Sequence, residues 1–206
     1  MPQSRRYKKK KSAGKAILAW IIVLAILAAA VFVFVLVFYE DTKKKLDEMN
    51  YPRTYSTYVE KAAKDYDLDP ALIYAVIHTE SGFDPKAESG VGAKGVMQMM
   101  PSSFEWLQEQ RGCAGQYTED DLFDPEICID YGSYLLKYFY DYYGTERSAI
   151  AAYNAGFVVS DWLSDTNYSS DGKNLDSIPY PETENYVDKV EKAKEMDVKL
   201  YYSQCN

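Results

Sequence analysis

A single carboxylate, Glu80, follows an apolar stretch at a position where it could act as an acid. Leu72, Ile73, Val76 and Ile77 recur at helical spacing, and Glu80 comes four residues after Val76 on the same helix face. A carboxyl group on such a face loses contact with water, and this raises its pKa. A carboxylic acid still protonated near neutral pH can act as a general acid. Position alone favours a carboxylate that only caps or ion-pairs at the helix end, so its surroundings must decide.

Local signals place Glu80 on a helix with defined ends. Asp69 is a typical N-cap, Pro70 suits the first helical position, and Gly82 can adopt the left-handed conformation that ends a helix. No sustained alternation with a period of two appears, so the chain is predicted to be mostly α. Further helices are expected over residues 55–66, from Pro101 onward, and over residues 130–143, 146–155 and 186–196.

Four sequence blocks accompany Glu80 along the chain. They are Glu80-Ser81, GVMQMMP at residues 95–101, AYNAG at 152–156 and PETENYV at 181–187. In order and spacing they resemble the blocks of the soluble-lytic-transglycosylase (SLT) family of peptidoglycan-cleaving enzymes, over about residues 55–195. One block alone would be weak, but the four together are specific.

The resemblance implies a lysozyme-like (goose-type/SLT) α fold and a reaction on peptidoglycan glycan strands. The family cleaves the β-1,4 bond between N-acetylmuramic acid and N-acetylglucosamine without adding water, and leaves a 1,6-anhydro ring. Glu80 would be the sole catalytic acid and base, with no cofactor and no metal. The substrate-binding residues that the resemblance implies are Ser89, Gln98, Met100, Tyr153, Asn154 and Glu182.

The resemblance also gives these residues individual roles. Ser89 would lie near the acid and the substrate N-acetyl group, Gln98 and Met100 would line the sugar subsites, and Tyr153 would hydrogen-bond near the reacting centre. Glu182 would be a second, non-nucleophilic polar group in the cleft.

Each role has a purely structural alternative. Ser89 would then only bend a loop, Tyr153 and Asn154 would form a packed helix end, and Glu182 would cap the last helix. Met97 and Met99 are expected in the core. His78 is the only histidine, but it lies two residues before Glu80 on a different helix face, so a structural role is expected.

Two positions depart from the family pattern. Val96 replaces a common Leu or Ile, and Glu184 replaces a common Arg, which puts any anion contact there in doubt.

A hydrolytic lysozyme of the same fold would need a water-orienting carboxylate, for which Glu88 and Asp84 are candidates. A non-catalytic wall-binding component of an envelope machine is the other alternative, although the intact Glu80 argues against it.

The charge pattern divides the 206 residues into three parts. Residues 1–15 hold seven basic residues and no acidic one, and residues 16–38 hold no charge. From residue 39 onward there are 16 basic and 31 acidic residues, a formal charge of −15. Such an acidic domain would repel phosphate, so a nucleic-acid partner is excluded.

The uncharged run is long enough to cross a bilayer core of roughly 30 Å as a helix. We therefore predict a cytoplasmic segment at 1–15, a transmembrane anchor at 16–38, a stalk at 39–53 and a catalytic domain at 54–206 outside the membrane. The protein would be a single-pass protein of the cell membrane. A signal peptide cleaved at residues 28–30 is the alternative, but the apolar run continues to Phe38, beyond the usual core of about 7–15 residues. Partners in an envelope complex cannot be named from these residues.

Three cysteines in an exported region allow a disulfide. Cys113 with Cys128 is the most local pairing, while Cys205 could replace either partner, and the sequence does not choose. One histidine and no close cysteine pair make a zinc site improbable.

Overall fold

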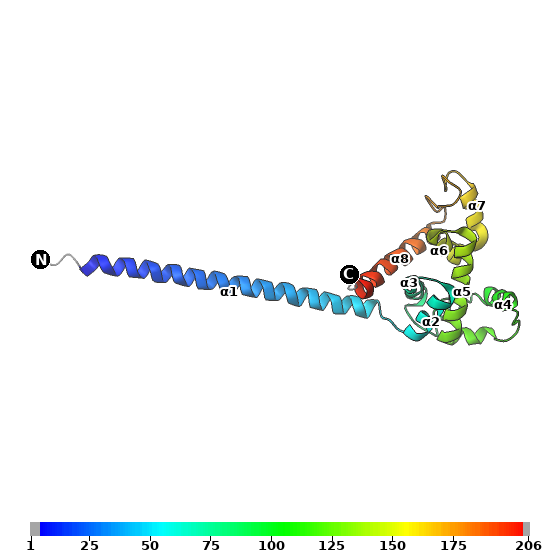
Figure 1. Ribbon diagram of the computed structural model, residues 1–206, viewed down its shortest axis with the longest axis horizontal. Helices are drawn as coiled ribbons and strands as arrows, with labels where there is room; N and C mark the ends of the chain where they lie inside the picture. The colour runs from blue at the N-terminus through cyan, green and yellow to red at the C-terminus, as the bar shows by residue number, and fades with distance from the viewer. Residues whose placement is uncertain (1–4, 204–206) are drawn as a thin grey trace. The chain divides into compact units, whose positions relative to one another are not determined.

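The structure is a computed structural model that describes the backbone of residues 5–203 and the side chains of residues 14–203. The chain forms two compact units, Met1–Asn50 and Tyr51–Asn206. Figure 1 shows a long helix in the first unit and an assembly of shorter helices in the second. Glu80 and all the predicted substrate-binding residues belong to the second unit.

Helix α1 (Arg5–Asn50) is continuous through the apolar run and beyond it. Its part from Gly14 to Asn50 is, among the described residues, the one helix long and apolar enough to cross a membrane, by length and composition alone. Past the apolar run, the i,i+4 ion pairs Lys45–Asp41 at 2.7 Å and Lys44–Glu48 at 3.8 Å support the helix. The predicted stalk is therefore helical up to Asn50. The basic side chains before Gly14 lie outside the described residues.

The second unit is mostly helical, as predicted, and its described residues contain no β-strand. Two isolated bridges, Glu88–Lys94 and Lys94–Met99, fold the segment between the third and fourth helices. The helices are α2 (Ser56–Tyr66), α3 (Pro70–Ser81), α4 (Pro101–Gln110), α5 (Pro125–Tyr143), α6 (Glu146–Ala155), α7 (Val159–Ser164) and α8 (Pro181–Asp197), with short turns η1 (Glu119–Phe123), η2 (Gly156–Val158) and η3 (Val198–Tyr202).

Helix α3, which carries Glu80, runs through the centre of this unit. The Asp69 side chain accepts the backbone N–H of Ala71 at 2.9 Å, and Gly82 ends the helix with φ of 59°, so both predicted caps are confirmed. The expectation of one inward face is wrong, because every residue from Ala71 to Ile77 is buried. Helix α8 and helix α2 both pack against α3, which explains why no face is left for water.

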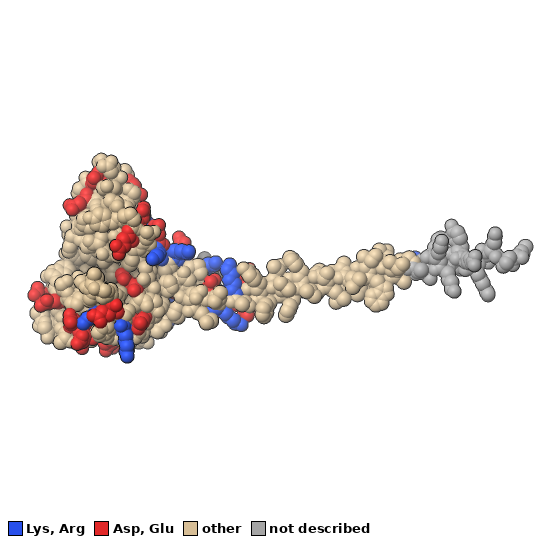
Figure 2. All heavy atoms as spheres, turned by 180° about the vertical axis from the view of Figure 1, so that it is seen from behind, with Lys and Arg blue, Asp and Glu red and all other residues tan. Residues whose placement is uncertain are grey.

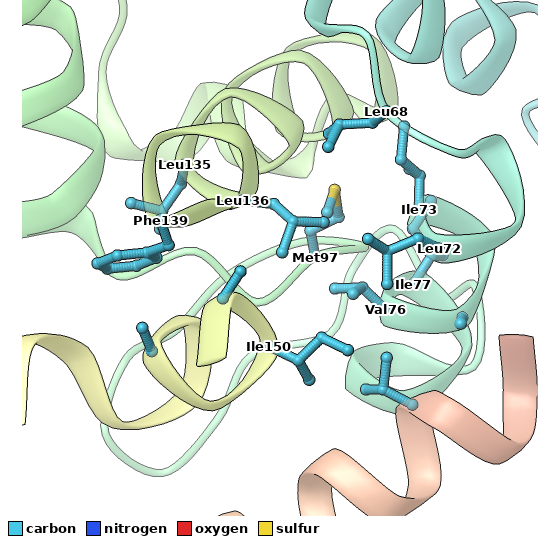
Figure 3. Packing of buried hydrophobic residues seen from close by; sticks show 14 of the residues in the cluster. Leu68, Leu72, Ile73, Val76, Ile77, Met97, Leu135, Leu136, Phe139 and Ile150 are labelled. Atoms are coloured by element: carbon cyan, nitrogen blue, oxygen red, sulfur yellow. The ribbon is translucent and has the colours of Figure 1, made fainter. Parts of the chain in front are cut away.

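The core joins α3 to the helices that follow it. Figure 3 shows Leu72 and Val76 of α3 on one side, Leu136 of α5 and Ile150 of α6 on the other, and Met97 among them. Met97 and its neighbour Met99 are 0% and 1% exposed, so the predicted core position of both is confirmed. Glu80 therefore stands on a helix that dense packing holds on all sides.

Two helices begin five residues before their predicted starts. Helix α5 begins at Pro125 instead of residue 130, because Asp124 accepts the backbone N–H of Glu126 at 2.9 Å and caps the helix. Helix α8 begins at Pro181 instead of residue 186, again with proline at the first helical position. Residues 181–187 thus belong to a helix, and their backbone is fixed.

The most local of the possible cysteine pairings, Cys113 with Cys128, does not form. Both thiols are free, and each contacts different neighbouring groups. The Cys113 sulfur lies 3.3 Å from the Tyr131 hydroxyl, whereas Cys128 accepts the backbone N–H of Met97 at 3.4 Å. Burial raises the pKa of the Cys128 thiol to about 12, so this thiol is inert at neutral pH. Cys205 lies outside the described residues.

Candidate active site

The Glu80 carboxyl group lies at the C-terminal end of α3, where α8 covers it. The hydroxyl group of Tyr186, on the second turn of α8, donates a hydrogen bond of 2.7 Å to Glu80 Oε1. Burial raises the pKa of Glu80 from 4.5 to about 7, while the hydrogen bond from Tyr186 lowers it by stabilising the charged form. Glu80 can therefore both hold and release a proton near neutral pH.

No neighbouring charge contributes to the raised pKa of Glu80 among the described residues. Asp84 and Glu88, the two candidates for orienting a water molecule, have exposed side chains. Asp84 Oδ1 accepts the backbone N–H of Lys86 at 2.9 Å and so stabilises its own turn. Glu80 is thus a lone carboxyl group whose pKa is set by burial and one tyrosine.

The segment 95–101 forms a tight turn that is tied to the end of α3. The Ser81 hydroxyl donates a hydrogen bond of 2.8 Å to the carbonyl oxygen of Val96. Gly95 has φ of 76°, and a Cβ atom there would lie 2.0 Å from the carbonyl oxygen of Leu122. Only glycine fits this position, both by conformation and by space. The turn is therefore fixed next to the residue that follows Glu80.

Gln98 holds this turn together. Its side-chain amide donates to the carbonyl oxygens of Ala87 and Gly95, both at 3.0 Å. Gln98 also has φ of 48°, an uncommon backbone conformation for a residue other than glycine. Both amide donor contacts thus serve the loop, and the subsite role of Gln98 stays a prediction.

Tyr153 connects α6 to the same turn. Its hydroxyl donates to the carbonyl oxygen of Met97 at 2.9 Å and lies 3.4 Å from the Met99 sulfur. Burial raises the pKa of Tyr153 well above 10, and the charge of Glu80 raises it further. Tyr153 is therefore close enough to Glu80 for the two groups to interact electrostatically.

The third and fourth blocks meet through a second contact between α6 and α8. The Thr183 hydroxyl donates to Asn154 Oδ1 at 2.8 Å, so these two blocks are joined side chain to side chain. Thr183 is buried while Asn154 is exposed. All four blocks therefore converge around the end of α3, which is the arrangement that a single catalytic centre requires.

Comparison with known proteins agrees with this arrangement. The family model described as "Transglycosylase SLT domain" matches residues 57–175. This chain belongs to the SLT family. The chain is 32% identical over 146 residues to the soluble lytic murein transglycosylase of Escherichia coli (strain K12), covering 69% of this chain and 23% of the relative. It thus spans about a quarter of that relative's length.

A membrane-bound relative and two solved structures add to the comparison. The chain is 31% identical to membrane-bound lytic murein transglycosylase C of Actinobacillus succinogenes, covering 69% of this chain and 46% of the relative. An inactive mutant of lytic transglycosylase Slt from Pseudomonas aeruginosa matches with a TM-score of 0.64 and 30% identity, covering 74% of this chain and 25% of that one. The 70 kDa soluble lytic transglycosylase of Escherichia coli matches with a TM-score of 0.67 and 27% identity, covering 78% of this chain and 26% of that one. The SLT-like helical fold is therefore confirmed.

The other predicted site residues of this SLT domain lie in different settings. Ser89 Oγ accepts the backbone N–H of Ala93 at 2.9 Å, so the hydroxyl shapes its own loop as the structural alternative expected. Met100 is 38% exposed and precedes the first residue of α4. Glu182 is exposed in the first turn of α8 and is not the N-cap, which is Tyr180. The substrate-binding roles of these three residues stay predictions.

Sequence reasoning missed Tyr186 as a site residue. Tyr186 was part of the fourth block, but the block was interpreted through Glu182. The hydrogen bond to Glu80 joins residues 106 positions apart, and no local pattern announces such a contact. His78, by contrast, packs as expected, with its ring 4.5 Å from that of Tyr51 and 6.3 Å from that of Phe83.

Proposed function

We propose that this protein is a membrane-anchored peptidoglycan lytic transglycosylase that leaves 1,6-anhydro-N-acetylmuramic acid ends. The observation that carries the proposal is a partly buried Glu80 whose pKa of about 7 has no contribution from a second carboxylate. A glycosidase that adds water uses two carboxyl groups. One carboxyl group suffices when a hydroxyl group of the substrate itself takes the place of water as the nucleophile.

In the first step, protonated Glu80 gives its proton to the glycosidic oxygen between the two sugars. The bond between this oxygen and C1 of N-acetylmuramic acid breaks, and positive charge develops at C1. The ionised Glu80 stays stabilised by the Tyr186 hydroxyl, which is 2.7 Å away. A pKa near the working pH suits a group that must both give and take a proton.

In the second step, Glu80 takes the proton from the C6 hydroxyl of the same sugar, and O6 bonds to C1. The anhydro ring closes, Glu80 returns to its protonated form, and no water is consumed. Gln98 and Tyr153 support this step by fixing the turn at residues 95–99, so that the wall of the cleft does not move. The substrate occupies the place that water would need.

Helix α1 serves as the anchor in this proposal. Its apolar side chains are exposed, as expected of a helix surrounded by lipid, and seven basic residues precede the apolar run. The positive-inside rule then puts residues 1–15 in the cytoplasm and the SLT domain outside. The membrane-bound relative supports anchoring, although it does not bear on orientation.

Digestion of purified sacculi tests the reaction. The full chain, reconstituted in nanodiscs, is incubated with sacculi, and the soluble muropeptides are analysed by mass spectrometry. We expect anhydro ends with the wild type and none with Glu80→Gln. Reducing ends would identify a hydrolytic lysozyme instead, and binding without release would identify a wall-binding protein. A similar solved structure is a complex of a 70-kDa soluble lytic transglycosylase with bulgecin A, so binding of bulgecin A to this protein gives a second test.

A further inference from the structure

Residues 51–55 lead from the end of α1 to the start of α2, and they lie against α3 and α8. Below, this segment is called the strap. Tyr51 and Pro52 of the strap, His78 of α3 and Ala193 of α8 line a cavity of only about 10 Å³. Such a volume holds at most about one water molecule, so the strap packs closely on both helices.

The strap covers one end of the helical turn that carries Glu80. This last turn of α3 is closed by the backbone hydrogen bond from Gly82 to the carbonyl oxygen of His78, at 3.1 Å. The ring of Tyr51 stacks on the ring of His78, with the ring centres 4.5 Å apart and the planes 20° apart. Tyr51 therefore holds the residue at which the turn begins.

Tyr55 holds the other end of the same turn. Its hydroxyl donates a hydrogen bond of 3.2 Å to the carbonyl oxygen of Phe83, the residue after Gly82. Tyr55 has φ of 64° and Phe83 has φ of 70°, a conformation that residues with side chains seldom adopt. Such a backbone persists only where its surroundings hold it. The hydrogen bond thus joins two positions that need support, and Glu80 lies between the two ends that the strap contacts.

The strap is also tied to the end of α8. Arg53 donates to the Asp197 carboxylate at 2.8 Å, and the hydroxyl of Tyr201 in η3 donates to the carbonyl oxygen of Tyr51 at 2.8 Å. Helix α8 carries Tyr186, the hydrogen-bond donor of the active site. The strap therefore contacts both helices whose meeting forms the site.

Three titratable groups from other helices interact with the charge of Glu80. They are Tyr186 of α8, Tyr153 of α6 and Cys128 of α5. Burial raises the pKa of both tyrosines well above 10 and that of Cys128 to about 12, so all three are uncharged at neutral pH. Access of water to Glu80 is therefore the variable that a loosened turn would change, and water would lower the pKa of Glu80 toward 4.5.

We propose that Tyr51 and Tyr55 are positioning residues of the active site, which hold the last turn of α3, and with it Glu80, where Tyr186 reaches it. This inference rests on the proposed function, because it takes Glu80 as the acid. The two tyrosines act through the backbone of α3 and not on the substrate. The segment by which the chain enters the SLT domain thus supports the acid of that domain.

Titration of Glu80 tests the proposal without relying on turnover. The full chain in nanodiscs carries ¹³C in its glutamate carboxyl groups, and NMR follows their shifts from about pH 4 to 9. Acidic side chains are spread over the surface of this unit in Figure 2, so the Glu80 signal is assigned as the one missing from Glu80→Gln. It should titrate near pH 7 in the wild type. Tyr55→Phe should lower this pKa by about half a pH unit, for the loss of one hydrogen bond between neutral groups. An unchanged pKa would overturn the proposal.

Two control variants separate positioning from general loosening. Tyr58→Phe is the same substitution at a half-buried tyrosine of α2, and it should leave the titration of Glu80 unchanged. Asp197→Asn loosens the tie to α8 but leaves the contacts of Tyr51 and Tyr55 with α3, so it should destabilise the fold without moving the pKa of Glu80. An equal pKa shift in Asp197→Asn and Tyr55→Phe would overturn the positioning role.

A second variant enlarges the effect. Tyr51→Leu combined with Tyr55→Phe removes both contacts with the turn, and the pKa of Glu80 should fall by about one pH unit. A pKa no lower than that of Tyr55→Phe would remove Tyr51 from the proposal. If the double variant misfolds, Tyr55→Phe decides by itself, because it removes a single oxygen atom.

The pH profile of turnover gives a second measurement. On the alkaline side of the kcat/KM profile, Tyr55→Phe should be about threefold slower than the wild type, with no difference on the acid side. A purely structural role would lower the profile equally at every pH and would overturn the proposal. Loss of the Tyr186 hydroxyl should shift the alkaline decline in the opposite direction, because that hydroxyl lowers the pKa of Glu80.

The two proposals fail in distinguishable ways. A lowered pKa of Glu80 in Tyr55→Phe, without anhydro products from the wild type, would leave the effect of the strap standing and reject the reaction. Anhydro products from the wild type, with an unmoved pKa of Glu80 in the variant, would reject the strap and leave the reaction standing.

Discussion

Two carboxylates on neighbouring helices, the partly buried Glu80 and the buried Asp197, have contrasting surroundings. Asp197 ends α8, its side chain is 5% exposed, and Arg53 donates to it at 2.8 Å. Arg53 in turn lies between the rings of Tyr201 and Tyr202, each 4.5 Å from the guanidinium carbon. Burial raises the pKa of Asp197, but the hydrogen bond and charge of Arg53 act against this. Glu80 is partly buried with no cation beside it among the described residues, and the neutral hydroxyl of Tyr186 donates to it.

The difference separates a carboxylate that stabilises the fold from one that can react. Removing one partner of a buried ion pair destabilises the fold, because the other charge is left buried and unpaired. A buried carboxyl group without a cationic partner instead tends to keep its proton. The same chemical group thus has a cationic partner at the end of α8 and only a neutral hydroxyl partner at the end of α3.

The largest effect is expected on catalysis. Glu80→Gln removes the proton donor while preserving shape, so we expect the release of anhydro muropeptides to fall by about 10³-fold, within the range for general acids. Asp197→Asn should keep full activity per folded molecule. Turnover of sacculi by both variants, corrected for the folded fraction, measures this. Comparable losses in the two would erase the proposed distinction.

Asp197→Asn should instead lower stability. It leaves the partly buried Arg53 guanidinium with only the longer, exposed contact to Glu60 at 3.7 Å, and breaking a buried pair costs about 3–5 kcal/mol. Arg53 retains 23% side-chain exposure, so we expect about 2–3 kcal/mol. Urea denaturation followed by tryptophan fluorescence gives the free energy of unfolding. An unchanged value would mean that the pair contributes nothing net.

Glu80→Gln should raise the free energy of unfolding in the same experiment, whereas Asp197→Asn should lower it. The pKa of Glu80 is about 7 when folded against 4.5 unfolded, so the folded state binds more protons between these values. Wild-type stability therefore falls as pH rises from about 4.5 to 7, by at most about 3 kcal/mol and by about 2 after allowing for partial exposure. At pH 8 the variant should be the more stable by this amount, and at pH 4 the two should agree. A difference that does not depend on pH would contradict the assigned pKa.

Tyr186→Phe should give the smallest effect. The hydroxyl lowers the pKa of Glu80, so its removal raises this pKa further, by about one pH unit for a hydrogen bond to a charged group. Wild-type kcat/KM should decline above pH 7, where Glu80 loses its proton, and the decline should begin at higher pH in the variant. Tyr180→Phe, on an exposed tyrosine of the same chain segment, is the control. A decline at the wild-type pH would remove Tyr186 from the site.

Local signals predicted the elements well where the relevant atoms are close in sequence. Asp69, Pro70 and Gly82 bound α3 as expected, because caps act through the backbone of the next few residues. The same signal at Asp124-Pro125 was passed over, and this put the start of α5 five residues late. The sequence left the cysteine pairing open, and the structure leaves Cys113 and Cys128 free, because sequence separation does not say where a thiol points.

The sequence by itself determined that a carboxyl group ends an apolar, capped helix, and that four blocks typical of one enzyme family accompany it. Only the tertiary structure decided the state of that group. Helix α8 covers Glu80 and brings the Tyr186 hydroxyl to 2.7 Å, while Arg53 pairs with Asp197 at the end of the same helix. A pKa depends on water and charge within a few ångströms, and residues far apart in the chain supply both. The sequence thus supplies the carboxyl group of Glu80, and the fold sets the pKa of that group.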